Sequence, residues 1–266
     1  MTQPASAPLC DCHVHVFSAS RPYTEASYQP PRKGIEAFRE EAMVDGIARA
    51  VLVQASIDGT DNSHLLEVLG SARHIALRGV VMIDEGTSGL AEMAEAGVRG
   101  VRIQDRTRLG INDLQRLPAL AARAFEQDWH VELNTEPQRY AALQALLGRL
   151  PARQALVLDH FGHIAPDSTE NLADLCRLLD SGRVWVKLAP TRVSRQIGRY
   201  DDLARPLRHL LAHYPERCLW GSDWPHVMTP PPLPRSADML AFLRRELSSA
   251  QLQACLVDNP AALYRF

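Results

Sequence analysis

Cysteine and excess basic charge are both scarce in this chain. It has 5 Cys among 266 residues, an odd and sparse set that argues against a disulfide scaffold and favours a reducing compartment. Its 29 Lys and Arg are balanced by 31 Asp and Glu, giving a formal net charge of -2. There is thus no basic surplus to attract nucleic acid or an anionic membrane, and we expect neither as a partner.

Long hydrophobic runs and targeting signals are also missing. No apolar run reaches the roughly 18 residues of a membrane span. Residues 1–8 have neither a basic n-region nor an apolar h-region, so we expect no secretion signal and a cytoplasmic location. The composition, 46% hydrophobic and 23% charged, is ordinary for a globular protein and excludes disorder, collagen and coiled coil.

Short β-branched segments alternate with helical patterns along the whole chain. The segments are nearly continuous in apolar residues, which is typical of strands buried on both faces of a parallel sheet. We expect strands at 9–16, 49–54, 77–83, 98–103, 129–133, 155–159, 184–188 and 217–221. Helices are expected near 35–46, 62–73, 88–96, 112–127, 137–149, 169–181, 201–214 and 236–247.

Eight strands alternating with eight helices predict an α/β protein with a (β/α)8 barrel, in a single domain spanning 1–266. The alternative is a doubly wound open sheet, but no Gly-rich phosphate turn follows the first strand. No linker, repeat or low-complexity segment divides the chain. We expect the tail, 249–266, to pack against the barrel wall.

Polar side chains follow the strands at the end where barrel enzymes place their active sites. His13 and His15 are two residues apart on the first strand and so face the same side. His160 follows the sixth strand, and Asp223 follows the eighth. We expect these three imidazoles and one carboxylate to converge at the barrel mouth. Asp159, next to His160, is expected to point to the opposite face as a structural hydrogen-bond acceptor.

A second group of side chains at this end is cationic. Arg102 ends the fourth strand, and Arg106 and Arg108 follow in its loop. Lys187 lies at the end of the seventh strand, and Arg192 lies just beyond it. A strand position would bury part of Arg102 and demand an anionic partner. Because guanidinium groups match carboxylates bidentately, the group is typical of a site for an anionic substrate.

Six motifs occur in an order that is more specific than any of them alone. They are D-C-H-V-H at 11–15, V-Q-A-S-I-D-G-T-D-N at 53–62, G-V-R at 100–102, L-D-H-F-G at 158–162, L-W-G-S-D-W-P-H at 219–226 and V-D-N-P at 257–260. From about residue 9 to the C-terminus, the chain resembles the amidohydrolase superfamily. The resemblance is to the branch that contains 2-pyrone-4,6-dicarboxylate lactonase and related sugar lactonases.

The resemblance implies a distorted (β/α)8 barrel that hydrolyses a lactone ring. Asp223 matches the aspartate that takes a proton from the attacking water, and His13, His15 and His160 match the histidines that polarise the lactone carbonyl. Ester hydrolysis needs such a base and such donors at the developing oxyanion. An aspartate is a weak base at neutral pH, so Asp223 would need a buried setting or a metal.

The resemblance also implies how the substrate is bound. Arg102, Arg108 and Arg192 match carboxylate-binding arginines, and Ser56 matches a serine that touches the substrate. Three further positions depart from the family, with Asn134 in place of a tyrosine, Asp58 in place of a histidine and His163 in place of an arginine. Losing a cation and gaining a carboxylate should weaken the preference for a second carboxylate on the substrate. We therefore leave three substrates open: 2-pyrone-4,6-dicarboxylate, a muconolactone and a sugar-acid lactone.

Many amidohydrolases hold one or two divalent metal ions, but this chain has Lys187 where a further histidine ligand is expected. We therefore predict that no metal cofactor is required. If one Zn²⁺ is bound, its ligands would come from His13, His15, His160 and Asp223.

Two other functions stay open at this point, a lactone isomerase and a non-catalytic ligand-binding barrel. A Zn-dependent decarboxylase is disfavoured because the first-strand motif lacks the Glu usual in those enzymes. The sequence makes no prediction of the oligomeric state.

Overall fold

Eight parallel strands, hydrogen-bonded in the order of the sequence, form the centre of the described structure. The computed structural model describes residues 8–18, 20, 21, 23, 26–71, 73–106 and 113–266. The sheet curls until its two edge strands meet, where a parallel bridge joins Val14 to Trp224. The predicted (β/α)8 barrel is thus confirmed, and the open sheet is excluded.

All eight expected strand segments form strands, although several ends differ. The strands are β1 (Leu9–Val14), β2 (Ile47–Val53), β3 (Ala76–Val81), β4 (Val98–Asp105), β5 (His130–Thr135), β6 (Leu156–Leu158), β7 (Val184–Leu188) and β8 (Cys218–Trp220). β6 and β8 end earlier than expected. Soon after each of them the backbone turns left-handed, with φ of 48° at His160 and 64° at Asp223. Extended structure cannot continue through such a residue.

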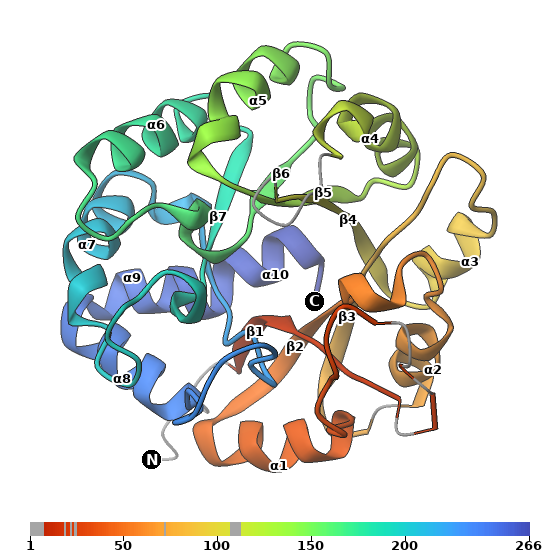
Figure 1. The fold of residues 1–266 in the computed structure, drawn as a ribbon, viewed down its shortest axis with the longest axis horizontal. Coiled ribbons are helices and arrows are strands. Elements are labelled where there is room, and N and C mark those ends of the chain that lie inside the picture. The colour runs from red at the N-terminus through yellow and green to blue at the C-terminus, as the bar shows by residue number, and fades with distance from the viewer. Residues whose placement is uncertain (1–7, 19, 22, 24–25, 72, 107–112) are drawn as a thin grey trace, which may run out of the picture.

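Helices surround the strands in a ring when the barrel is seen end on (Figure 1). They are α1 (Ile35–Asp45), α2 (Ser63–Ser71), α3 (Leu90–Glu95), α4 (Leu117–Glu126), α5 (Tyr140–Leu147), α6 (Thr169–Leu179), α7 (Ala204–His213), α8 (Ser236–Glu246), α9 (Ser249–Gln253) and α10 (Asn259–Tyr264). Among the described residues, none of the helices has both the length and the apolar character that crossing a membrane requires.

The barrel interior has an apolar layer beneath a charged one. The apolar layer consists of Cys10, Cys12, Val51, Val53, Val80, Val157, Leu219 and Tyr264. Tyr264 belongs to α10, which crosses the barrel axis in Figure 1. The tail therefore does more than pack on the wall as expected, because it also inserts an aromatic ring into the interior. Cys10 and Cys12 are small core residues, as alternation with polar positions on a barrel strand allows.

The seam between β1 and the segment after β8 is held by main-chain bonds and one buried carboxylate. Asp11 Oδ1 accepts hydrogen bonds from the backbone N–H of His13 (3.1 Å) and of Ser222 (2.9 Å). The N–H of Asp223 donates to the carbonyl of His13 at 2.9 Å. Gly221 permits this approach, since a Cβ there would lie 2.6 Å from His13 Cβ. The seam thus brings residues 13 and 223 together.

Replacing Asp11 by Asn is expected to change how stability depends on pH. Burial raises the pKa of Asp11 to about 6, above its ordinary 3.8. The folded state therefore holds this proton more tightly than the unfolded state, and ionisation destabilises the fold as the pH rises through about 4 to 6. Asn keeps the two acceptor contacts and cannot ionise.

Urea denaturation at pH 5 and pH 7.5 measures the effect. We expect Asp11→Asn to gain about 1.4 kcal/mol relative to the wild type between the two pH values, because one pH unit below the folded pKa corresponds to about that much. A stability difference between variant and wild type that does not change with pH would contradict this role of Asp11.

Candidate active site

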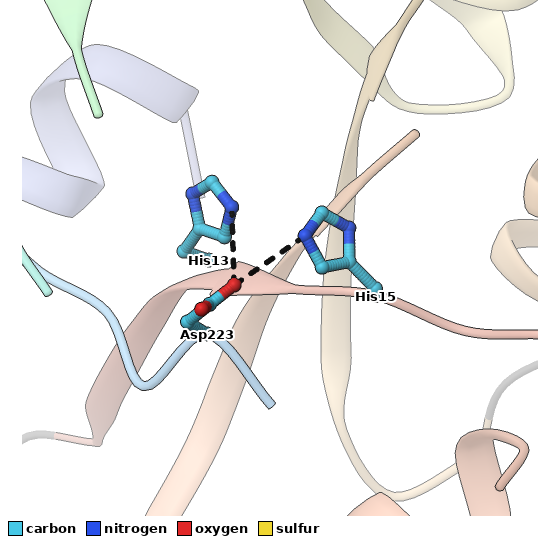
Figure 2. A group of neighbouring side chains, drawn as sticks. All are labelled: His13, His15 and Asp223. Carbon is cyan, nitrogen blue, oxygen red and sulfur yellow. Dashed lines mark ion pairs between the residues drawn. The ribbon is translucent and has the colours of Figure 1, made fainter. Parts of the chain in front are cut away.

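His13, His15 and Asp223 point toward one another at the barrel mouth (Figure 2). Asp223 Oδ1 lies 3.9 Å from His13 Nε2 and 3.6 Å from His15 Nε2. All three side chains are buried, with Asp223 only 1% exposed. The other carboxylate oxygen, Oδ2, accepts hydrogen bonds from Arg192 Nε at 2.6 Å and from Thr191 Oγ1 at 3.1 Å.

His160 completes the predicted group. Its ring centroid lies 4.8 Å from that of His13, and its side chain is buried. The structure therefore brings together the four residues predicted as catalytic, from the ends of β1, β6 and β8. Their chemical roles stay predictions.

The prediction that the Asp159 side chain points away from the mouth was wrong, although Asp159 accepts hydrogen bonds as expected, from Arg102 Nε and Nη2. Its side chain points into the barrel, with Oδ1 3.4 Å from His13 Nδ1 and Oδ2 3.1 Å from Arg102 Nη2. The left-handed backbone at His160 interrupts the alternation of a strand. Two consecutive residues, Asp159 and His160, can therefore both face the mouth. Arg102 finds its anionic partner within the chain, and its Nη1 donates to the carbonyl of Gln54 at 3.1 Å.

A buried ion pair below His13 was missed by sequence reasoning. Lys187 and Glu132 are both fully buried and form a hydrogen-bonded ion pair. Lys187 Nζ also lies 3.3 Å from His13 Nδ1. Lys187 is thus a structural cation of the interior and not a group facing an anionic substrate. Side chains two residues apart on a strand face the same side, so Glu132 faces the same side as Asn134 on β5. This alternation could have predicted that Glu132 points into the barrel.

Burial and charge move the pKa values of the group in different directions. Burial lowers the pKa of His13 and of His160, which keeps both imidazoles neutral at pH 7. Burial raises the pKa of Asp223, but Arg192 and the imidazoles act against it, and the result is well below the ordinary value. Asp223 is therefore an anion at neutral pH.

The hydrogen bond of His15 fixes which ring nitrogen carries its proton. Nδ1 lies 2.7 Å from the carbonyl oxygen of Val53, which can only accept, so Nδ1 carries the hydrogen. In neutral His15, Nε2 is then an acceptor that faces Asp223 Oδ1. For His13 the geometry leaves two tautomers, because Nδ1 lies between Lys187 Nζ, a donor, and Asp159 Oδ1, an acceptor.

A cavity of about 280 Å³ opens over this group. Most of the predicted substrate-binding residues line it, and Arg106 and Tyr28 contribute to its wall. The predicted residues among its lining are His15, Ser56, Arg102, Asn134, His160, Arg192 and Asp223. Arg108 lies outside the described residues. His163 lines a neighbouring cavity of about 650 Å³, which shares Arg106 and Arg192 with the first.

The residues present fit a single divalent cation. The side-chain donor atoms of His13, His15 and Asp223 all lie within 4.8 Å of one another. Two of these atoms, His13 Nε2 and Asp223 Oδ1, are buried and have no hydrogen-bond partner among the described residues. Three protein ligands with an open fourth position are the pattern of a catalytic zinc. His160 does not belong to this group of three. It belongs to a second group that could hold a metal ion, together with His13 and Asp159.

Replacing Lys187 by Met should destabilise the protein by about 3–5 kcal/mol, because it leaves Glu132 buried without its hydrogen-bonded cation. The double variant Lys187→Met with Glu132→Gln should recover part of this loss. Denaturation in urea measures both. The matched control is Lys33→Met, which breaks an exposed pair with Glu41 and should cost about 1 kcal/mol or less. Equal effects at residues 187 and 33 would contradict the assignment.

Comparisons with known proteins identify relatives that match most of the chain. The amidohydrolase family model matches residues 10–266. A 4-sulfomuconolactone hydrolase of Rhizobium radiobacter is 31% identical over 272 residues, covering 96% of this chain and 89% of the relative. A D-galactarolactone isomerase of Agrobacterium fabrum is 32% identical over 278 residues, covering 96% of this chain and 90% of the relative.

A solved structure shows the same fold over its whole length. It is a Pseudomonas putida protein to which 2-pyrone-4,6-dicarboxylic acid hydrolase activity has been ascribed, with a TM-score of 0.83 and 31% identity. The match covers 97% of this chain and 98% of that one. With the family model matched from strand β1 to the C-terminus, the chain belongs to the amidohydrolase family.

Proposed function

We propose that this chain is a hydrolase that opens the ring ester of a carboxylated lactone. One observation carries the proposal: a buried carboxylate oxygen, Asp223 Oδ1, faces two imidazoles in a cavity lined by arginines. The names of two relatives, 4-sulfomuconolactone hydrolase and D-galactarolactone isomerase, support a lactone as the substrate. The proposal treats residues 1–266 as one catalytic domain that acts in the cytoplasm on a small molecule.

Water is activated between two acceptors in this proposal. Asp223 Oδ1 and His15 Nε2 are 3.6 Å apart, so one water molecule can donate a hydrogen to each. Asp223 takes a proton as the water oxygen bonds to the lactone carbonyl carbon. The bond between that carbon and the ring oxygen then breaks, and Asp223 returns the proton to the ring oxygen. The new carboxylic acid ionises and releases one proton to the solvent.

The oxyanion is stabilised by neutral imidazole donors. In this role His13 needs the tautomer in which Nδ1 accepts a hydrogen bond from Lys187 and Nε2 carries the proton. His160 is buried and neutral at pH 7, and its Nδ1 has no partner among the described residues. A preorganised donor of this kind contributes about 10²–10³-fold to kcat. The family resemblance implied that His15 polarises the lactone carbonyl. We propose instead that His15 binds the attacking water, because Nε2 of the neutral ring is an acceptor.

The substrate carboxylate is assigned to Arg192. Its Nε holds Asp223, its side chain is 22% exposed, and it lines both cavities. The two terminal nitrogens have no partner among the described residues and can bind a carboxylate bidentately. Arg102, Arg108 and Ser56 stay predicted contacts. Arg102 uses Nε, Nη1 and Nη2 for Asp159 and Gln54, so it forms a fixed part of the wall.

A divalent metal held by His13, His15 and Asp223 would polarise the carbonyl and lower the pKa of its bound water. We propose that the reaction does not require it. Arg192 and Lys187 already bring positive charge to Asp223 and His13, the same residues that would hold the ion.

A lactone isomerase is the second candidate, favoured by the D-galactarolactone isomerase among the relatives. In that reaction a hydroxyl of the substrate itself, and not water, attacks the carbonyl. The same base and the same donors would serve. An isomerase returns a lactone and releases no acid, so a pH indicator separates the two reactions.

Asp223→Asn is expected to lower kcat by about 10²–10⁴-fold with a much smaller change in KM, because the lost group acts in the transition state. Steady-state kinetics on a panel of carboxylated lactones measures this. Asp167→Asn, which changes an exposed carboxylate paired with Arg195, is the control and should keep full activity. A raised KM with unchanged kcat for Asp223→Asn would refute its role as the base.

Exhaustive dialysis against a chelator should leave kcat and KM unchanged, with metal well below one ion per chain by elemental analysis. Loss of activity that added Zn²⁺ restores would contradict the metal-free proposal. It would leave the assignment of a lactone as the substrate intact.

A further inference from the structure

The two imidazoles of β1 have opposite surroundings on Nδ1. His15 Nδ1 lies 2.7 Å from the carbonyl oxygen of Val53, which can only accept a hydrogen bond. His13 Nδ1 lies 3.3 Å from Nζ of Lys187. An ammonium group has three donors and no acceptor, so in this hydrogen bond Nδ1 of His13 is the acceptor. The two rings should therefore carry their protons on different nitrogens.

Two carboxylates compete with Lys187 for the same nitrogen of His13. Asp159 Oδ1 lies 3.4 Å from Nδ1 and Glu132 Oε1 lies 3.6 Å from it, and either oxygen would favour a proton on Nδ1. Both oxygens are buried, and neither has a hydrogen-bond partner within the part of the chain that the structure describes. His13 therefore donates to neither of them, and the contact with Lys187 favours the tautomer with the proton on Nε2.

Lys187 is held in place below His13 and shielded from water. Its side chain is fully buried in the barrel, where it forms the ion pair with Glu132. Asp159 Oδ1 lies a further 3.9 Å from Nζ. The two carboxylates offset the cost of burying the ammonium. Because no solvent reaches this position, water cannot replace Lys187 as the donor to Nδ1.

The His13 tautomer decides which kind of group faces the cavity. His13 Nε2 is buried, has no hydrogen-bond partner among the described residues, and lies 3.9 Å from Asp223 Oδ1. With its proton on Nε2, His13 is a donor at the mouth, whereas Nε2 of neutral His15 is an acceptor. One strand thus supplies a donor for the carbonyl oxygen and an acceptor for the attacking water.

The same tautomer opposes metal binding. A metal-binding imidazole coordinates through an unprotonated nitrogen, and its other nitrogen usually donates to a carboxylate, a backbone carbonyl or water. His15 meets both conditions, since its Nδ1 donates to Val53. His13 meets neither, because its Nδ1 faces a donor. The group of His13, His15 and Asp223 therefore has the spacing of a metal site, but one of its three ligands is blocked by a proton.

We propose that Lys187 is a positioning residue whose hydrogen bond to Nδ1 fixes the tautomer of His13, which makes His13 a donor to the lactone carbonyl and withdraws it from metal binding. The role at the carbonyl rests on the proposed lactonase function. The tautomer and the weakened metal binding do not rest on it, so they can be tested separately.

Nuclear magnetic resonance of the metal-free wild type, labelled with ¹⁵N in the histidine rings, tests the proposal at pH 7. The nitrogen shifts distinguish a protonated ring nitrogen from a bare one, and His13→Gln and His15→Gln assign the signals. We expect the proton on Nε2 in His13 and on Nδ1 in His15. A proton on Nδ1 of His13 would overturn the proposal without any variant of Lys187.

Lys187→Met combined with Glu132→Leu removes the donor without leaving a carboxylate unpaired at position 132. Asp159 should then draw the His13 proton to Nδ1, while the tautomer of His15 stays unchanged as an internal control. We expect kcat to fall by about 10²–10³-fold with little change in KM, because a donor to the oxyanion is lost. Zn²⁺ should bind about 10–100-fold more tightly by calorimetry, and adding His15→Ala should abolish this gain.

Thermal denaturation checks that the double variant is folded. The control is Arg177→Met, which changes an exposed arginine paired with Asp174 on α6 and should alter neither tautomer, kcat nor zinc affinity. An unchanged His13 tautomer in the folded double variant, or a zinc affinity equal to that of the wild type, would overturn the role of Lys187. A wild type that opens no carboxylated lactone would overturn the proposed function alone, because the resonance and zinc measurements still decide the role of Lys187.

Discussion

The site depends on one constraint, the close approach of β1 to the segment after β8. A carboxylate and two imidazoles from positions 13, 15 and 223 are buried, with their donor atoms within 4.8 Å of one another. Burying an anion in a protein interior is costly unless partners compensate it. Backbone bonds across the seam, the carboxylate of Asp11 and the missing side chain of Gly221 hold the groups together.

Charge compensation within the barrel explains which arginines are available to a substrate. Arg102 is bound to Asp159 and Lys187 to Glu132, so both pairs belong to the interior. Arg192 binds Asp223 through Nε, and its side chain also lines the cavity. In our proposal, the carboxylate of the substrate therefore meets Arg192 at the outer side of the site. Its lactone ring can then lie inward, over the water-binding acceptors.

The barrel could be predicted from the sequence because parallel strands buried on both faces are nearly continuous apolar runs. The convergence of His13, His15, His160 and Asp223 followed from that fold, since strand ends meet at one rim. The orientation of Asp159 could not be predicted. It depends on a left-handed backbone at His160, which a non-glycine residue rarely adopts and which has no local sequence signal.

Contacts between residues on different strands and loops of the barrel also could not be predicted from the sequence. Glu132 and Lys187 are 55 positions apart, and only the closed barrel shows that they pair. The same holds for the insertion of Tyr264 into the interior and for the convergence of Asn134 and His163 on Arg106. Such contacts depend on barrel curvature and register, which no single segment encodes.

Turnover in ¹⁸O-labelled water tests the central claim most directly, because the account makes a water molecule held by Asp223 and His15 the nucleophile. It predicts a ring-opened acid with one ¹⁸O atom in the newly formed carboxylate, and no label in the hydroxyl that was the ring oxygen. An unlabelled, rearranged lactone, or label in that hydroxyl, would contradict attack of water at the carbonyl carbon.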